Sequence, residues 1–73
     1  MYPGKKELDI LKEKYPIGCR VMLIKMDDPQ APPQGTYGTV RCIDDTGTIM
    51  VSWDTGSGLG VLYNHDFCVR VFE

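Results

Sequence analysis

Apolar and polar residues alternate over Thr48–Trp53, directly before a run of turn-forming residues. Ile49, Val51 and Trp53 fall on one face of a strand, and the residues between them fall on the other. Asp54–Gly58 then interrupts the alternation with Asp, Thr, Ser and Gly, which favour turns. This stretch predicts a central β-hairpin, around which the rest of the chain can be arranged.

Similar alternation predicts four more strands. We therefore expect an all-β chain with strands at Cys19–Met26, Thr36–Asp44, Thr48–Trp53, Leu59–Tyr63 and Phe67–Phe72. The connector Asp27–Gly35 contains three prolines, which exclude a central strand and predict an irregular loop. Gly47 is expected to take a positive φ in the hairpin turn, and Asn64–Asp66 to form a single 3₁₀ turn.

The first expected strand is apolar on both faces. Val21 and Leu23 point one way, and Met22 and Ile24 point the other. A strand with two apolar faces is usually covered on both sides. We therefore expect one pair inside a barrel and the other pair beneath a helix.

One helix is expected, at Lys5–Lys14. Leu8, Leu11 and Tyr15 recur at the i, i+3 and i+7 positions of a narrow apolar stripe, and Pro16 ends the segment. Ten residues are marginal as an isolated helix, so the helix should persist only if its leucines dock on the barrel. The alternative is a mobile arm. Either way, we divide the chain into an N-terminal arm or helix (1–15) and a barrel (16–73).

The order of these elements is typical of a small five-stranded SH3-like barrel with one N-terminal helix. Three motifs resemble a bacterial family of short uncharacterised domains, which also shares the Met26–Gly35 stretch nearly as it stands. The motifs are Gly18-x-Arg20-Val21, Pro33-x-Gly35-x-x-Gly38-Thr39-Val40 and Ile49-x-Val51-x-Trp53-Asp54-x-Gly56. The Gly-Thr-Val and Trp-Asp-x-Gly framework is more distantly similar to the mind-bomb type of SH3-like domain. That likeness implies peptide binding.

Length and charge narrow the function. Seventy-three residues allow one small domain, in which a shallow binding surface is easier to build than a deep cleft. The net charge of −2 is unevenly spread: residues 1–26 carry six basic and three acidic side chains, whereas residues 27–73 carry two basic and seven acidic ones. An acidic barrel repels phosphate, so nucleic-acid binding through it is disfavoured.

Location is suggested by the cysteines and by the lack of long apolar runs. The three cysteines are widely spaced and odd in number, which favours a reducing, cytoplasmic setting over a secreted disulfide scaffold. No apolar run reaches the roughly 18 residues of a membrane helix, and residues 1–15 are too charged for a signal peptide. We expect no membrane association.

Catalytic and metal-binding interpretations are weaker than structural ones. The acidic pairs Asp27–Asp28 and Asp44–Asp45 lie beside Pro or Gly, where Asp commonly caps turns. His65 and Cys68 could act as base and nucleophile, but no third orienting group accompanies them. With Cys19 and Cys42 they form a Cys₃His set that lacks the close Cys pair of small zinc sites. We therefore expect a non-catalytic protein without metal or cofactor.

We favour a binding surface over catalysis and metal binding. It would lie on the rim between Asp27–Gly35 and Asp54–Leu59, and would bind a basic or proline-rich segment of a protein or peptide partner. The candidate ligand-binding residues are Asp27, Asp28, Pro32, Pro33, Tyr37, Trp53, Asp54 and Tyr63. In the competing interpretation, Trp53 instead fills the end of the barrel.

Two further alternatives stay open at this point. A basic helix face formed by lysines, with bases stacking on the aromatic residues, would make the chain a weak nucleic-acid-binding accessory protein. The lysines concerned are Lys5, Lys6, Lys12 and Lys14. Exposed barrel edges could also pair between chains, so the expected state is a monomer or a weak homodimer.

Overall fold

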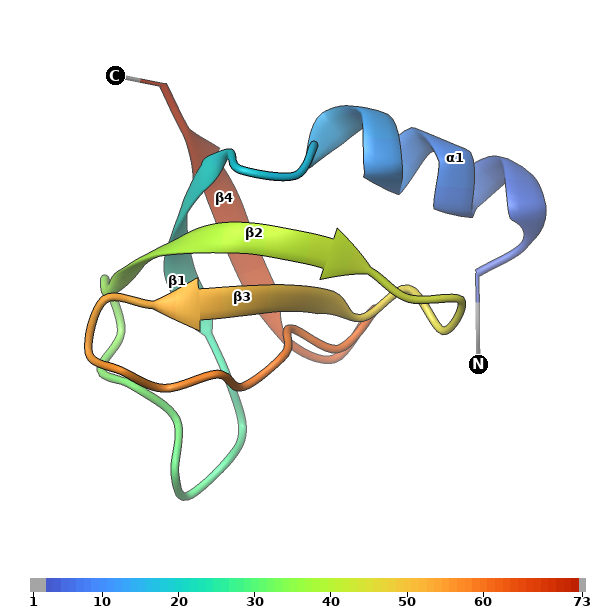
Figure 1. The fold of residues 1–73 in the computed structure, drawn as a ribbon. Helices are drawn as coiled ribbons and strands as arrows, with labels where there is room; N and C mark the ends of the chain where they lie inside the picture. The colour runs from blue at the N-terminus through green and yellow to red at the C-terminus, as the bar shows by residue number, and fades with distance from the viewer. Residues whose placement is uncertain (1–2, 73) are drawn as a thin grey trace.

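The computed structural model describes residues 3–72, which form one short helix and a four-stranded antiparallel sheet (Figure 1). In chain order the elements are α1 (Lys5–Lys14), β1 (Arg20–Lys25), β2 (Tyr37–Ile43), β3 (Ile49–Trp53) and β4 (Phe67–Val71). The strand order across the sheet is β3-β2-β1-β4, so the last strand lies beside the first. The chain is thus mostly β, as its alternating pattern predicts.

Helix α1 has the predicted bounds. Its first turn contains Glu7 and its last turn contains two lysines, which suits the helix dipole. It ends where the Tyr15 N–H donates to the Leu11 carbonyl oxygen (2.8 Å), one residue before Pro16. No residue of α1 itself is buried, but Leu11 packs against the core. Among residues 3–72, no helix has the length and apolar character that a membrane crossing needs.

The turn between β2 and β3 is built around Asp44. Its carboxylate accepts hydrogen bonds from the Thr46 hydroxyl and from the N–H groups of Thr46 (2.9 Å) and Thr48 (3.0 Å). The Thr46 hydroxyl and these N–H groups lower the pKa of the Asp44 carboxyl, although desolvation acts in the opposite direction. Gly47 takes the predicted positive φ of 83°, which only glycine adopts freely.

The strand expected at Leu59–Tyr63 is corrected to a single bridge. Only Val61 pairs with β3, through two hydrogen bonds to Ile49 (3.0 and 2.9 Å between N and O). Before it, the Leu59 carbonyl oxygen accepts the indole N–H of Trp53 (2.8 Å). The backbone oxygen that would begin a ladder is therefore bonded to a side chain.

The chain also turns immediately after this bridge. The Leu62 carbonyl oxygen accepts the N–H groups of His65 (3.1 Å) and Asp66 (2.9 Å), and Asn64 between them has a positive φ of 58°. The bond from His65 to Leu62 spans three residues, as in the expected single 3₁₀ turn, although residues 63–65 form a turn and not a 3₁₀ helix. The strands consequently form an open sheet of four in place of a closed barrel of five.

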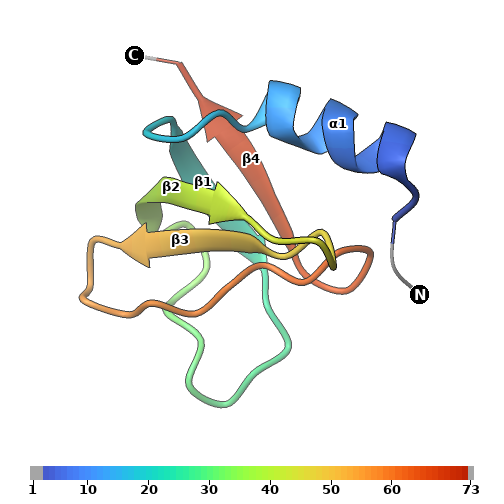
Figure 2. The same cartoon turned by 45° about the vertical axis from the view of Figure 1, so that its right-hand side comes forward.

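The core lies on one face of the sheet, between the strands, the bridge and α1. Its members are Tyr15, Val21, Leu23, Val40, Ile49, Val51, Trp53, Val61 and Cys68. The Tyr15 hydroxyl donates to the Cys68 carbonyl oxygen (3.3 Å), which links the end of α1 to β4. Figure 2 shows the C-terminal end of α1 beside β4, while the loop 27–35 lies at the opposite end of the sheet.

The expectation that the helix covers one face of β1 and the barrel core the other is also corrected. Helix α1 docks through Leu11 on the core, to which Val21 and Leu23 belong, because the buried residues of β1 all face that side. On the other face, Ile24 lies in a hollow that the proline-rich loop helps to form, and Met22 is half-buried beside Tyr37. Within the described part of the chain, the outer face of the sheet therefore has no helix over it.

Candidate functional site

The aromatic residues of the predicted rim do not form one cluster. Trp53 is only 3% exposed, and its indole N–H is bonded to the Leu59 carbonyl oxygen. It is therefore part of the core, as in the alternative in which Trp53 is not a binding residue. Tyr37 is 46% exposed, at the end of the sheet where β3 finishes. Tyr63 lies beside Gly47, at the end where β3 begins. The structure therefore separates the two tyrosines by the length of β3.

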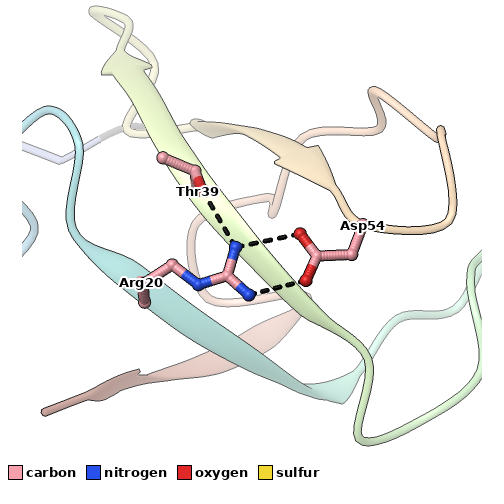
Figure 3. A network of polar contacts seen from close by, with 3 residues as sticks. All are labelled: Arg20, Thr39 and Asp54. Carbon is pink, nitrogen blue, oxygen red and sulfur yellow. Dashed lines mark hydrogen bonds and ion pairs between the residues drawn. The ribbon is translucent and has the colours of Figure 1, made fainter. Parts of the chain in front are cut away.

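Asp54 makes an ion pair on the outer face of the sheet (Figure 3). Its carboxylate oxygens accept two hydrogen bonds from the Arg20 guanidinium, at 2.9 and 2.6 Å, and the same guanidinium donates to the Thr39 hydroxyl at 3.0 Å. These bonds lower the pKa of the Asp54 carboxyl below its ordinary value. Asp54 thus joins the end of β3 to β1 and β2, a role that its position in a turn did not indicate.

The two prolines of the predicted site differ in exposure. Pro32 is buried and lines a small hollow with Ile24 and Met26, whereas Pro33 is exposed. The Pro33 carbonyl oxygen accepts the Thr36 N–H (3.1 Å), which holds the end of the loop against the start of β2. Of the two rings, only that of Pro33 is open to a partner.

The predicted acidic residues and the second rim segment do meet. Asp27 and Asp28 line a hollow of about 240 Å³ together with Leu59. The other apolar side chains of this hollow are Met26, Met50 and Leu62. Among residues 3–72, no Lys or Arg lines it. We call this feature the acidic hollow.

The carboxylates of Asp27 and Asp28 in the acidic hollow differ in their contacts. Asp28 accepts the N–H of Gln30 (2.8 Å), an ordinary turn-capping bond. The Asp27 carboxylate has neither a hydrogen bond nor an ion pair within residues 3–72. Both residues are exposed. The acidic hollow therefore combines an apolar lining with negative charge that no neighbouring cation balances.

A buried carboxylate, that of Asp66, also lines the acidic hollow. It is 6% exposed and accepts the N–H groups of Asp27 (3.2 Å) and Leu62 (3.1 Å), with His65 Nδ1 at 3.1 Å. Burial acts to raise the pKa of this carboxyl, but these hydrogen bonds outweigh burial and lower it. Asp66 therefore ties the long loop to the turn after the bridge, whereas its sequence suggested only a polar connector.

We predict that Asp66→Asn is less stable than the wild type at neutral pH, and that this difference shrinks in acid. The unfolded carboxyl has a pKa of about 3.9, and the folded one is lower, so its stabilisation is present above that value and lost as the pH falls through the folded pKa. Urea unfolding at pH 7 and at pH 3 measures the difference. Asp45→Asn, at an exposed turn, is the matched control; a constant Asp66→Asn deficit at both pH values would contradict the prediction.

The residues proposed for metal binding or catalysis, Cys19, Cys42, His65 and Cys68, do not form one site. Within the part of the chain from residue 3 to 72, no three His, Cys, Asp or Glu side chains are grouped so as to hold a metal ion. Burial and the nearby Cys19 raise the pKa of the Cys68 thiol to about 11, although Lys14 acts to lower it. A thiol with this pKa is protonated at neutral pH and is a poor nucleophile. His65 is turned towards Asp66.

The helix lysines do not share one face. At about 3.6 residues per turn, Lys5 and Lys12 lie together, while Lys6 and Lys14 lie on other sides of α1. Glu7, Asp9 and Glu13 are interspersed among them. This distribution offers less continuous positive charge to a phosphate backbone than the sequence suggested.

Comparison with known proteins gives a family but no activity. Neither the curated proteins nor the solved structures include a match to this chain. A family model described as a domain of unknown function (DUF4314) matches residues 4–71. That match covers α1 and all four strands. The chain therefore belongs to the DUF4314 family of domains of unknown function.

Proposed function

We propose that this chain is a non-catalytic binding module that takes a basic segment of a protein or peptide partner in the acidic hollow. The observation that carries the proposal is the meeting of four apolar side chains with Asp27 and Asp28 where, among residues 3–72, no Lys or Arg is present. Lysine and arginine have an aliphatic stem and a charged tip, so they match such a surface in both respects.

The proline-rich loop offers a continuation of the same surface. Met26 lines both the acidic hollow and the hollow of Pro32, and the exposed Pro33 follows directly. An extended segment lying across Met26 would reach from the carboxylates to the loop. This geometry favours a basic segment that also contains apolar or proline residues.

We further propose that the framework is SH3-like and that the protein works in the bacterial cytoplasm. The three consecutive antiparallel strands, the long first loop and the return of β4 beside β1 support the first point. Free thiols at Cys19, Cys42 and Cys68 support a reducing setting.

The proposal is tested with fluorescein-labelled peptides in which Arg alternates with Leu or Pro, measured by fluorescence anisotropy at low ionic strength. The double variant Asp27→Asn/Asp28→Asn should bind about tenfold more weakly, because two exposed charge pairs are lost. Met50→Ala should also weaken binding by removing apolar lining. The matched control is Asp45→Asn, which removes one exposed carboxylate outside the acidic hollow and should leave the affinity nearly unchanged.

Two results would reject the proposal. One is equal binding of the peptides by the wild type and the double variant. The other is binding of a single-stranded oligonucleotide alone, with a steep loss of affinity on adding salt, which would favour the nucleic-acid alternative.

A further inference from the structure

The two edges of the sheet differ in how they are covered. The β3 edge is capped by the Ile49–Val61 bridge. The β4 edge has no strand beside it within residues 3–72. A sheet edge presents unpaired N–H and C=O groups, to which another extended segment can add. Any strand addition to this sheet would therefore occur at β4.

The register shows which residues of β4 present these groups. Leu23 of β1 directs its backbone to the β2 side, because it accepts the Gly35 N–H and donates to the Thr36 carbonyl oxygen (both 2.8 Å). Leu23 is opposite Cys68, so this pair is not hydrogen-bonded across the strands. Cys68, and by alternation Arg70, therefore direct their N–H and C=O groups outwards. The Cys68 carbonyl oxygen already accepts the Tyr15 hydroxyl at 3.3 Å.

The two faces beside this edge have different chemistry. On the outer face, Phe67 and Val69 are 50% and 44% exposed, and Val71 follows them in the same row. On the core face, Arg70 lies beside the end of α1, where its guanidinium donates to the Lys14 carbonyl oxygen (3.4 Å). The outer row, Phe67, Val69 and Val71, is therefore apolar, whereas Arg70 makes the core face of this edge basic.

A hollow of about 400 Å³ lies along the core face of this edge. It is lined by Lys14, Arg70 and the rings of Tyr15 and Phe72, and among residues 3–72 no carboxylate lines it. Each cation lies over a ring, with Lys14 Nζ 5.5 Å from the Tyr15 centroid and Arg70 Cζ 4.6 Å from that of Phe72. Within residues 3–72 neither cation has an ion pair with a carboxylate.

We propose that the β4 edge is a second binding site, which takes an extended strand of alternating apolar and acidic residues from a partner protein. Such a strand would pair with the outward N–H and C=O groups of Arg70 and with the N–H of Cys68, whose carbonyl oxygen is already bonded to Tyr15. Its apolar side chains would then extend the outer row beside Val69, while its carboxylates would face Arg70 and Lys14, because successive side chains of a strand point to opposite faces.

A second copy of this chain fits the edge less well. Arg70 is the charged residue of β4, so pairing two copies would place two arginines and two Lys14 side chains on one face. A nucleic acid would be attracted to the cations, but it has no amide groups to pair with the strand edge. An acidic strand would match the basic face with its carboxylates, the exposed apolar row with its apolar side chains, and the unpaired backbone groups of β4 with its own.

This site is independent of the acidic hollow, and the two require ligands of opposite charge. The loop that carries Asp27 and Asp28 and the helix α1 lie at opposite ends of the sheet (Figure 2). The double variant Asp27→Asn/Asp28→Asn should therefore retain binding of an acidic strand, which separates a failure of one proposal from a failure of the other.

The test uses a fluorescein-labelled nonapeptide in which Val and Glu alternate, with anisotropy for affinity and ¹⁵N-labelled protein for location. We expect amide shifts centred on Cys68 and Arg70. Arg70→Gln should weaken binding about fivefold, because a charge-assisted contact is lost. Lys12→Gln, an exposed position outside the hollow, is the matched control and should change affinity less than twofold.

Backbone pairing is tested on the peptide, so that the protein stays unaltered. N-methylation of the peptide amides on one set of alternate residues should abolish binding, while methylation of the other set should not, because only one set faces β4. Equal effects of the two sets would overturn the proposal. So would equal binding of a Val–Lys peptide, binding of an oligonucleotide alone, or dimerisation through β4 in sedimentation experiments without peptide.

Discussion

Replacing Trp53 with alanine is expected to unfold most of the protein at 25 °C. The side chain is 3% exposed, and its ring packs in the core beside Gly38. Truncating a buried tryptophan costs about 3–5 kcal/mol, and a domain of this size has a free energy of unfolding of only a few kcal/mol. The indole N–H that bonds the Leu59 carbonyl oxygen is lost as well, which releases the segment leading to the bridge.

This result is measured by far-UV circular dichroism during urea titration, because the variant has no tryptophan fluorescence. Tyr37→Ala is the matched control: the tyrosine is 46% exposed, so its truncation should cost less than about 1 kcal/mol. A Trp53→Ala protein that unfolds cooperatively at nearly the wild-type urea concentration would show that the ring is dispensable to the core.

Gly38→Ala is expected to lower the free energy of unfolding by about 1–3 kcal/mol, by overpacking the pair of strands β2 and β3. A Cβ at this position would lie 2.5 Å from Val51 Cγ1, 2.7 Å from Trp53 Cε3 and 3.0 Å from the Ser52 carbonyl oxygen. The side chains belong to the buried core and the oxygen to the backbone of β3, so none of them can move cheaply.

Gly58→Ala is the matched control for this prediction. Nothing lies within 4 Å of its Cβ position, and its φ is not in the left-handed region. It should be neutral or slightly stabilising, because alanine restricts the unfolded chain. Urea midpoints at unchanged slope provide the comparison. If Gly38→Ala and Gly58→Ala had equal midpoints, the close contact at Gly38 would carry no energetic consequence.

The helix and the strands β1, β2, β3 and β4 all fall within the ranges that the sequence predicts. These predictions succeed because periodicity records which residues face the core, and because Pro16 and Gly47 act through their own backbone preferences. The expected strand at Leu59–Tyr63 has the same kind of pattern. It fails because the Leu59 carbonyl oxygen bonds to Trp53 instead of a strand.

The candidate site was only partly predictable from the sequence, because the pattern does not reveal which distant groups bond to each other. The sequence brings Asp27, Asp28 and Leu59 into one hypothesis through their loops, and the structure does place them around one hollow. The sequence left open whether Trp53 lies in the core or on the binding surface, and the structure shows it buried while Tyr37 is exposed. One short motif does not reveal the function of a side chain whose partners lie 30 or more residues away.

Local pattern alone therefore determined the helix, four of the five expected strands, their order and the strongly uneven charge of the two parts of the chain. The tertiary structure decided which elements meet: the Arg20–Asp54 pair that joins the end of β3 to β1, the Asp66 carboxylate that bonds the Asp27 N–H at the acidic hollow, and the open edge at β4. Hydrogen-bonding groups are present in every segment, and only the folded arrangement selects their partners. A backbone oxygen that bonds to an indole is no longer available to a neighbouring strand, and that competition leaves the segment after Leu59 with a single bridge to β3.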